Sequence, residues 1–337
     1  MRNQDIKTKK PAKVAFTASI PAEVILAAHK VPVDLNNVFI TAPAPLRWVE
    51  QAEMGGYPRN ACSWIKGMYA LVSPSDYEAV IAVVHGDCSN TEALAETWRL
   101  KRVATVPFAY PHARDRASLK REIDQLADRF AVPISAVEAV RRDLQEVRDL
   151  AADIDRLTWQ ENVVSGGENH LYLVNCSDFQ GDPCSYRQQL ADFIATAHQR
   201  EPFQEKVRLA YIGVPPIFSD LYEVLESLGA RVVFNEVQRE FSMPLAAKDI
   251  YEQYLLYSYP YGAFARLGNI LPELAKRNID GIIHYTQTFC YRQIEDIIYR
   301  QRLPLPVLSL EGERPGAVDM RTRMRLEAFI TMLAAQK

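Results

Sequence analysis

The regular alternation of short buried strands and helices along the sequence is the feature that most constrains the fold of this chain. Residues 77–84 (YEAVIAVV) form a continuous apolar run of strand length, and residues 102–108 (RVATVPF) form another. Between them, the segment SNTEALAETWRL begins with Ser89-x-x-Glu92, the capping pattern that marks the start of a helix. A strand, a helix and a second strand at this spacing predict a βαβ unit and therefore a parallel sheet.

The same alternation returns in the second half of the chain. A helical segment, DLYEVLESLG, ends at Gly229, and the amphipathic segment RMRLEAFITMLAAQ predicts a terminal helix. Buried-strand patterns lie within residues 207–216, 230–236, 279–285 and 305–310. These runs predict a second parallel sheet.

A helical region separates the two halves. Residues 117–160 repeat apolar side chains at helical spacing and predict two amphipathic helices joined near Pro133. The run LYLVN at residues 171–175 is interpreted as a strand. The predicted fold is α/β, with two parallel-sheet lobes joined by a helical segment. Its predicted divisions are a tail at 1–12, a first α/β lobe at 13–116, a helical and mixed connecting segment at 117–200 and a second α/β lobe at 201–337.

Composition excludes several classes of protein. Of the 337 residues, 48% are apolar and 24% are charged, and the net charge of −3 argues against binding nucleic acid or an anionic membrane surface. No apolar stretch reaches the roughly 18–20 residues that span a bilayer. The charged N-terminus is not followed by a hydrophobic signal segment, so we expect a solvated tail on a cytoplasmic protein.

Five cysteines are the next constraint. Their odd number and wide spacing argue against a disulfide framework, and the absence of a C-x-x-C pair argues against zinc-ribbon and thioredoxin-like sites. Either they are small core residues, or some of them converge on a metal centre. The five are Cys62, Cys88, Cys176, Cys184 and Cys290.

Three of these cysteines are predicted at helix starts. Cys62 opens the helical segment ACSWIKGMYAL, Cys88 follows a strand and precedes Ser89, and Cys290 lies two residues after Thr288, a predicted N-cap. Ligands bind beyond the carboxyl ends of parallel strands, and helix N-termini favour thiolates by lowering thiol pKa values. Three thiolates facing one cleft could hold a four-iron cubane and leave one iron free for water or a substrate oxygen.

Several stretches carry a family resemblance. They include TASIPAEVILAAHKVPV, NACSWIKGMYAL and DYEAVIAVVHGDCSNTEAL in the first half, and YIGVPPIFSDLYEVLESLGARVVFNE, IDGIIHYTQTFCYRQIEDIIYRQRLPLPVLSLEGE and TRMRLEAFITML in the second. In this order and over nearly the whole chain, the sequence resembles subunits of the 2-hydroxyacyl-CoA dehydratase and benzoyl-CoA reductase family.

The resemblance implies two Rossmann-like (flavodoxin-like) lobes with a [4Fe–4S] cluster in the cleft between them, held by Cys62, Cys88 and Cys290. It also implies pairing with a sister subunit or a second copy of the chain. A separate ATP-hydrolysing iron–sulfur activator then injects one low-potential electron and makes a ketyl radical anion of an acyl-CoA thioester, which expels the hydroxyl group. The chain has no Walker motif and no G-x-G-x-x-G, so we expect it to bind no nucleotide itself.

The resemblance leaves two other functions open. A related double-cubane cluster protein is a homodimer that carries an [8Fe–9S] cluster and reduces small molecules such as acetylene. A third possibility is an electron-carrying subunit whose cluster never touches substrate. Cys176 and Cys184 are either additional cluster ligands, which would favour the double cubane, or residues packed in the cleft wall; full thiolate ligation of a double cubane needs six cysteines and one chain has five.

Two further residues are candidates for catalysis. Ser19 lies where the family brings substrate near the cluster, and its alternative role is to cap the helix that begins at Pro21. His284 adjoins a predicted ligand and could move a proton in the cleft, or it could be a structural residue at the end of a strand.

Overall fold

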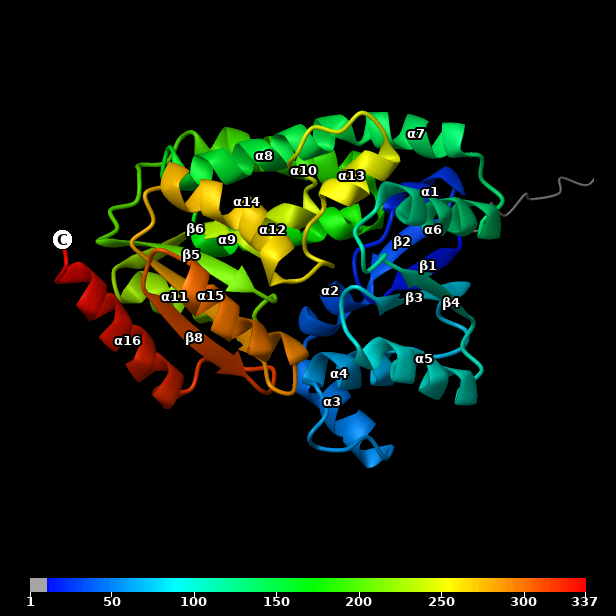
Figure 1. Ribbon diagram of the computed structural model, residues 1–337, viewed down its shortest axis with the longest axis horizontal. Helices are drawn as coiled ribbons and strands as arrows, with labels where there is room; N and C mark the ends of the chain where they lie inside the picture. Colours follow the sequence, from blue (N-terminus) through cyan, green and yellow to red (C-terminus); the bar gives the residue numbers. More distant parts are fainter. Residues whose placement is uncertain (1–10) are drawn as a thin grey trace, which may run out of the picture.

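Two parallel sheets of four strands form the framework of the molecule (Figure 1). The computed structural model describes residues 11–337, so most of the predicted tail 1–12 lies outside the described residues. The strand order is β2-β1-β3-β4 in the first sheet and β6-β5-β7-β8 in the second. Both sheets thus have the 2-1-3-4 order of flavodoxin-like folds, which confirms the predicted α/β architecture with two parallel-sheet lobes.

In the first lobe, the strands bury both of their faces. Along β1, Val14 and Phe16 belong to a core formed with α1 and the connecting helices, whereas Ala15 faces α4 and α5, where Trp98 is fully buried. The strand β2 was not predicted. The elements are β1 (Lys13–Phe16), α1 (Ala22–Ala27), β2 (Val31–Asp34), α2 (Leu35–Ile40), α3 (Pro45–Met54), α4 (Ser63–Leu71), β3 (Ala79–His85), α5 (Asn90–Leu100) and β4 (Thr105–Ala109).

The connecting segment is entirely helical, and this corrects two predictions. The region of the two predicted helices contains three, because the helix after Pro133 ends at Asp143 and another begins at Gln145. The run LYLVN is not a strand but the end of α9 and the start of a 3-10 turn. The elements are α6 (Arg116–Arg129), α7 (Ile134–Asp143), α8 (Gln145–Trp159), α9 (Gly166–Val174), η1 (Asn175–Ser177), η2 (Phe179–Gly181) and α10 (Pro183–Ala197).

Helix α8 contacts both lobes through buried ion pairs. Near its N-terminus, Arg148 donates to the buried Glu23 of α1 at 2.5 Å. Near its C-terminus, Asp155 accepts two hydrogen bonds from Arg277 of the second lobe, at 2.5 and 2.8 Å. In Figure 1, α7 and α8 follow one another along the top of the molecule, α7 on the side of the first lobe and α8 on the side of the second. The connecting segment therefore fixes one lobe relative to the other.

The second lobe repeats the layers of the first. One face of its sheet packs against α11 and α16, and the other against α14 and α15. The elements are β5 (Val207–Gly213), α11 (Leu221–Ser227), β6 (Ala230–Asn235), α12 (Glu236–Phe241), α13 (Ile250–Leu256), α14 (Ala263–Lys276), β7 (Gly281–Gln287), η3 (Tyr291–Glu295), α15 (Asp296–Arg302), β8 (Val307–Gly312) and α16 (Met320–Ala334).

The structure confirms one predicted helix start and contradicts another. The helix α5 begins directly after Ser89, but the Ser89 side chain makes no capping hydrogen bond. Thr288 is not an N-cap, because its hydroxyl donates to the Gly312 carbonyl oxygen and the following turn is a 3-10 helix that begins after Cys290. In the segment that follows, Ile294 and Ile297 are largely solvent-exposed, at 71% and 61%.

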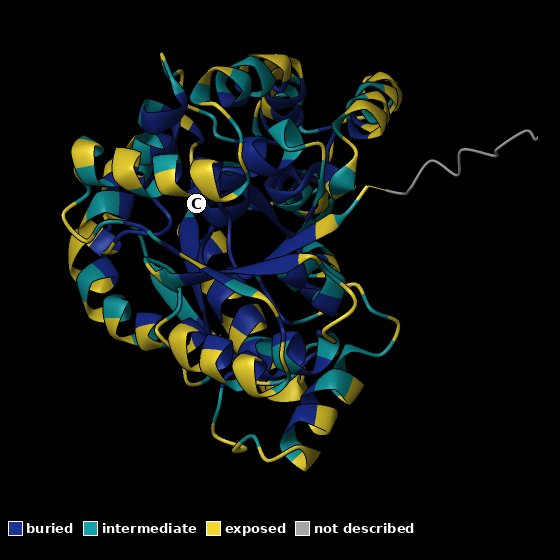
Figure 2. Cartoon of the chain, turned by 90° about the vertical axis from the view of Figure 1, so that its right-hand side faces the viewer, coloured by how far each residue is buried: buried dark blue, intermediate teal, exposed yellow. Residues whose placement is uncertain are grey.

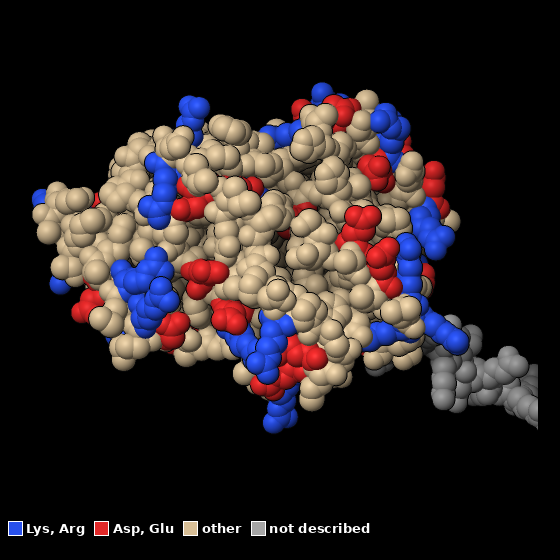
Figure 3. Space-filling model, turned by 60° about the horizontal axis from the view of Figure 1, so that its bottom comes forward, with Lys and Arg blue, Asp and Glu red and all other residues tan. Residues whose placement is uncertain are grey.

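Burial and charge are distributed as in a water-exposed globular protein. Figure 2 shows buried residues in the strands and on the inward sides of the helices, with exposed residues outside. On the face seen in Figure 3, basic and acidic side chains are interspersed. None of the helices within residues 11–337 combines the length and apolar character needed to cross a membrane.

Candidate functional site

A cavity lies where the carboxyl ends of the two sheets face each other. It has a volume of about 140 Å³, and we call it the chamber. The loops after β1, β3, β5 and β7 contribute to its wall, together with α2, α4 and α9. In each sheet these loops follow the two central strands, between which the direction of strand order reverses. Ligands of doubly wound sheets bind at this switch point, and here two switch points share one chamber.

The three predicted cluster cysteines all line the chamber. Cys62 stands at the N-cap of α4, and Cys88 and Cys290 each follow the third strand of a sheet, at the same offset of three residues from its last residue. Both of these loops contain left-handed backbone, at Gly86 (φ +102°) and Phe289 (φ +66°). The structure therefore brings together three thiols from both lobes.

Hydrogen bonds between the lobes hold the cysteine loops together. The Tyr291 hydroxyl, next to Cys290, donates to the Asp87 carbonyl oxygen, next to Cys88, at 2.7 Å. The Ser63 hydroxyl, next to Cys62, donates to the Glu313 carbonyl oxygen at 2.6 Å. For each of the three cysteines, a residue adjacent in the sequence thus takes part in a hydrogen bond between the two lobes.

Burial sets the acidity of these thiols, and this corrects a prediction. Burial raises the pKa of Cys62 to about 11 and that of Cys88 to about 12, and it also raises the pKa of Cys290. Backbone N–H groups at each helix start oppose this rise without reversing it. The expected lowering by helix N-termini is therefore outweighed by desolvation, and metal binding would release the thiol protons.

The arrangement of the thiols can be compared with the donor set that an iron–sulfur cluster requires. Within residues 11–337, no three His, Cys, Asp or Glu side chains come close enough together to hold one metal ion. In a cubane each thiolate binds a separate iron, so the sulfurs stand apart around the core. Three thiols from separate loops around one chamber, each with a backbone N–H group as a hydrogen-bond donor, offer donors of the type that such a core takes.

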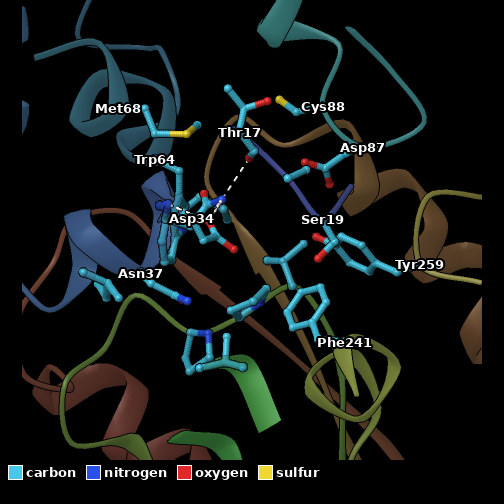
Figure 4. A pocket seen from close by; sticks show the side chains of 18 of the residues that line it. Thr17, Ser19, Asp34, Asn37, Trp64, Met68, Asp87, Cys88, Phe241 and Tyr259 are labelled. Carbon is cyan, nitrogen blue, oxygen red and sulfur yellow. Dashed lines mark hydrogen bonds between the residues drawn. The ribbon is translucent and has the colours of Figure 1, made fainter. Parts of the chain in front are cut away.

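Polar groups that sequence reasoning missed also line the chamber. Figure 4 shows Asp34, at the end of β2, and Asp87, beside Cys88, directed toward it. Burial raises the pKa of both carboxyl groups. Asp34 was not identified from the sequence because its strand was not predicted. Asp87 and Arg292 lie one and two residues from candidate ligands, so the sequence did contain a signal for them.

The two candidate catalytic residues lie in different places. Ser19 is buried in the chamber wall, and it does not cap α1, whose N-cap position is Pro21. His284 is fully buried, its Nδ1 lies 2.8 Å from the Asp296 carboxylate, and it is not among the residues that line the chamber. Of the two, only Ser19 is placed with the cysteines.

The remaining cysteines lie outside the chamber. Cys176 is buried behind its wall, where the thiol donates to the Tyr172 carbonyl oxygen at 3.6 Å. Cys184 is exposed in the first turn of α10, which Asp182 caps. Neither joins the three chamber thiols.

Replacing Gly86 with alanine is expected to destabilise the loop that carries Cys88. An added Cβ would lie 2.6 Å from Cβ of Tyr110, whereas at Gly56, with a similar φ of +104°, it would meet nothing within 4 Å. Both alanines carry the left-handed backbone cost of about 1–2 kcal/mol, and Gly86→Ala adds overpacking of about 1–3 kcal/mol. Urea unfolding of the two variants measures the difference. Equal losses of stability would contradict close packing of this loop.

Comparison with protein-family models shows which family the chain belongs to. The family model of the 2-hydroxyglutaryl-CoA dehydratase D-component matches residues 17–333, from the residue after β1 to the last turn of α16. The chain belongs to this family. No curated protein matches it. The predicted membership of the 2-hydroxyacyl-CoA dehydratase family is thus confirmed.

Membership of the dehydratase D-component family has a direct meaning for the chamber. The match includes all three of its cysteines and every strand of the two sheets except β1, which ends at Phe16. A D-component is one part of a multi-subunit dehydratase, so the chain is a subunit of a dehydratase-type enzyme.

Proposed function

We propose that this chain is the iron–sulfur subunit of a 2-hydroxyacyl-CoA dehydratase-type enzyme. It receives a low-potential electron from an ATP-hydrolysing iron–sulfur activator, and the enzyme acts on an acyl-CoA thioester. The observation that carries the proposal is the meeting of Cys62, Cys88 and Cys290 at one chamber, in a chain of the D-component family. Its partner is a sister subunit of the same family or a second copy of the chain.

The proposed cofactor is a single [4Fe–4S] cluster. Cys62, Cys88 and Cys290 would hold three of its irons. When bound, the cluster would supply one-electron chemistry, forming a ketyl radical anion of the thioester that expels the 2-hydroxyl group, and an iron without a protein thiolate for a substrate oxygen. The double cubane is the alternative, and the positions of Cys176 behind the wall and Cys184 at the surface favour the single cubane.

The other side chains of the chamber have roles of their own. Trp64, Met68 and Phe241 give it an apolar wall, which excludes water and provides a surface for an acyl group (Figure 4). Ser19 and Asp34 place a hydroxyl and a carboxyl group on the same wall. Both can hold or transfer a proton, and the raised pKa of Asp34 brings its carboxyl group closer to neutral pH.

The test begins with iron and acid-labile sulfide in the full chain purified without oxygen. We expect about four of each per chain, the content of one cubane. The chain is then combined with a sister subunit and an activator of this family, and dehydration of a panel of 2-hydroxyacyl-CoA thioesters is measured with and without ATP. Turnover that requires ATP and all components supports the proposal.

Each departure from this result has a distinct meaning. About eight irons per chain, as in two cubanes, would favour the double-cubane reductase and call for assays with small substrates such as acetylene. A reducible cluster whose spectrum no thioester perturbs would favour an electron-carrying subunit. Failure to bind iron after careful reconstitution would overturn the cluster and the proposed function with it.

A further inference from the structure

Arg292 is a buried cation in the wall of the chamber. It follows Cys290 by two residues, its side chain is 1% exposed, and it belongs to the short 3-10 helix η3. Its Nη2 donates to the Tyr259 carbonyl oxygen at 2.9 Å, and its Nη1 lies 3.2 Å from Glu295. The guanidinium is therefore held in one position beside a proposed cluster ligand.

The charges around it are arranged asymmetrically. Among the described residues that line the chamber, Arg292 is the one lysine or arginine, and it shares the wall with the carboxyl groups of Asp34, which is buried, and Asp87, which is partly buried. Its ion-pair partner Glu295 does not line the chamber. The positive end of this pair thus faces the cavity, and the negative end faces away from it.

A second buried arginine stands behind the first. Arg266 is fully buried, forms a bidentate pair with Glu236 at 2.5 and 2.8 Å, and lies 3.5 Å from Glu295. The guanidinium carbons of Arg266 and Arg292 lie 5.3 and 4.9 Å from the ring centroid of Tyr259. Burying two cations this close together is costly, and packing alone does not require charge at either position.

The positive charge of Arg292 would interact favourably with a negatively charged cluster. Three thiolates and the sulfides of a cubane leave the whole centre anionic, and reduction adds one more negative charge. A fixed cation in a low-dielectric wall stabilises the reduced form more than the oxidised form. The groups around a cluster set its potential through charge and hydrogen bonds.

We propose that Arg292 sets the reduction potential of the cluster held by Cys62, Cys88 and Cys290, by stabilising its reduced state. This inference rests on the proposed function, because it requires the cluster. Arg292 is a positioning residue for charge rather than a catalytic residue, since nothing in its geometry requires contact with the substrate. Glu295 acts against it by partly neutralising the guanidinium.

The test is a redox titration of the reconstituted full chain, followed by the electron paramagnetic resonance signal of the reduced cluster. Arg292→Gln is expected to lower the ratio of reduced to oxidised cluster at a fixed potential by about tenfold, a negative shift of about 59 mV for one electron. Arg292→Lys keeps the charge and is expected to recover most of the shift. Arg300→Gln, a half-exposed arginine on α15 that does not line the chamber, is the control without effect.

A second variant tests the same inference from the other side. Glu295→Gln frees Arg292 from its partner and is expected to shift the potential in the positive direction. This variant keeps the test decisive if Arg292→Gln loses its cluster during purification. Equal potentials in the wild type, Arg292→Gln and Glu295→Gln would overturn the inference, as would equal negative shifts in Arg292→Gln and Arg292→Lys. A wild-type chain that binds no iron would instead overturn the proposed function.

Discussion

Cys290→Ser is expected to abolish the cluster while leaving the fold intact. Serine has nearly the volume of cysteine, but its hydroxyl is a poor ligand for iron, so the cubane would lose one of three protein ligands. We expect iron to fall from about four atoms per chain to near zero after purification. Iron and sulfide analysis, together with the visible absorbance of the cluster, measures the loss.

Cys184→Ser is the matched control for this experiment. Cys184 is exposed on α10 and does not line the chamber, so its replacement is expected to leave iron content unchanged. Far-ultraviolet circular dichroism of both variants distinguishes loss of cluster from loss of fold. Full iron content in Cys290→Ser, or an equal loss in Cys184→Ser, would show that the chamber cysteines are not the ligands.

Asp155→Ala is expected to cause the largest loss of stability, about 3–5 kcal/mol, because it removes one of the two carboxylates that neutralise two largely buried guanidinium groups. Asp155 accepts hydrogen bonds from both terminal nitrogens of Arg277, which is 1% exposed, and it lies 3.3 Å from Arg239. Among the described residues, Glu273 is then the one carboxylate that remains paired with the two arginines. Chemical denaturation measures the free energy of unfolding.

The control lies two residues away on the same helix. Asp153 pairs with Arg156 at 3.4 Å, but both side chains are well exposed, so Asp153→Ala is expected to cost less than about 1 kcal/mol. Equal losses of stability in the two variants would contradict the role given to the buried network.

Acidification provides an independent check of the same ion pairs. Burial raises the pKa of Asp155, but Arg277 and Arg239 outweigh it and hold the pKa below its ordinary value of 3.8. A depressed folded-state pKa contributes stability that is fully present above the unfolded pKa and is lost as the pH falls through the folded pKa. The stability difference between wild type and Asp155→Ala should therefore be constant near neutral pH and shrink below about pH 4.

Sequence patterns predicted the fold well where strands are continuous apolar runs. The four-residue strand β2, VPVD, was missed because it is short, contains Pro32 and ends on a charged residue. The error at LYLVN has an instructive cause. Ser165 and Glu168 form a complete capping box at the start of α9, whereas the same pattern at Ser89 makes no capping bond. The sequence thus contained the signal for the helix, and the capping pattern alone does not distinguish the two sites.

The site could be predicted in part for a topological reason. Parallel strands place their carboxyl ends at one edge, so the strand pattern alone assigns Cys88 and Cys290 to such edges. The extent to which each side chain of the site is buried could not be predicted. The pKa of the Cys62 thiol depends on burial by residues distant in the chain, and the position of Asp34 depends on a strand that has little sequence signal.

The way the chamber is shared between the lobes has a mechanical consequence. Cys62 and Cys88 belong to the first lobe and Cys290 to the second, and the chain between Cys88 and Cys290 contains the connecting helices and most of the second lobe. An inorganic core bound to all three would act as a cross-link that closes a very long loop, as a disulfide between distant segments does. Its insertion would have to follow folding of both lobes. Its removal would weaken the contact between the two lobes before either sheet unfolds.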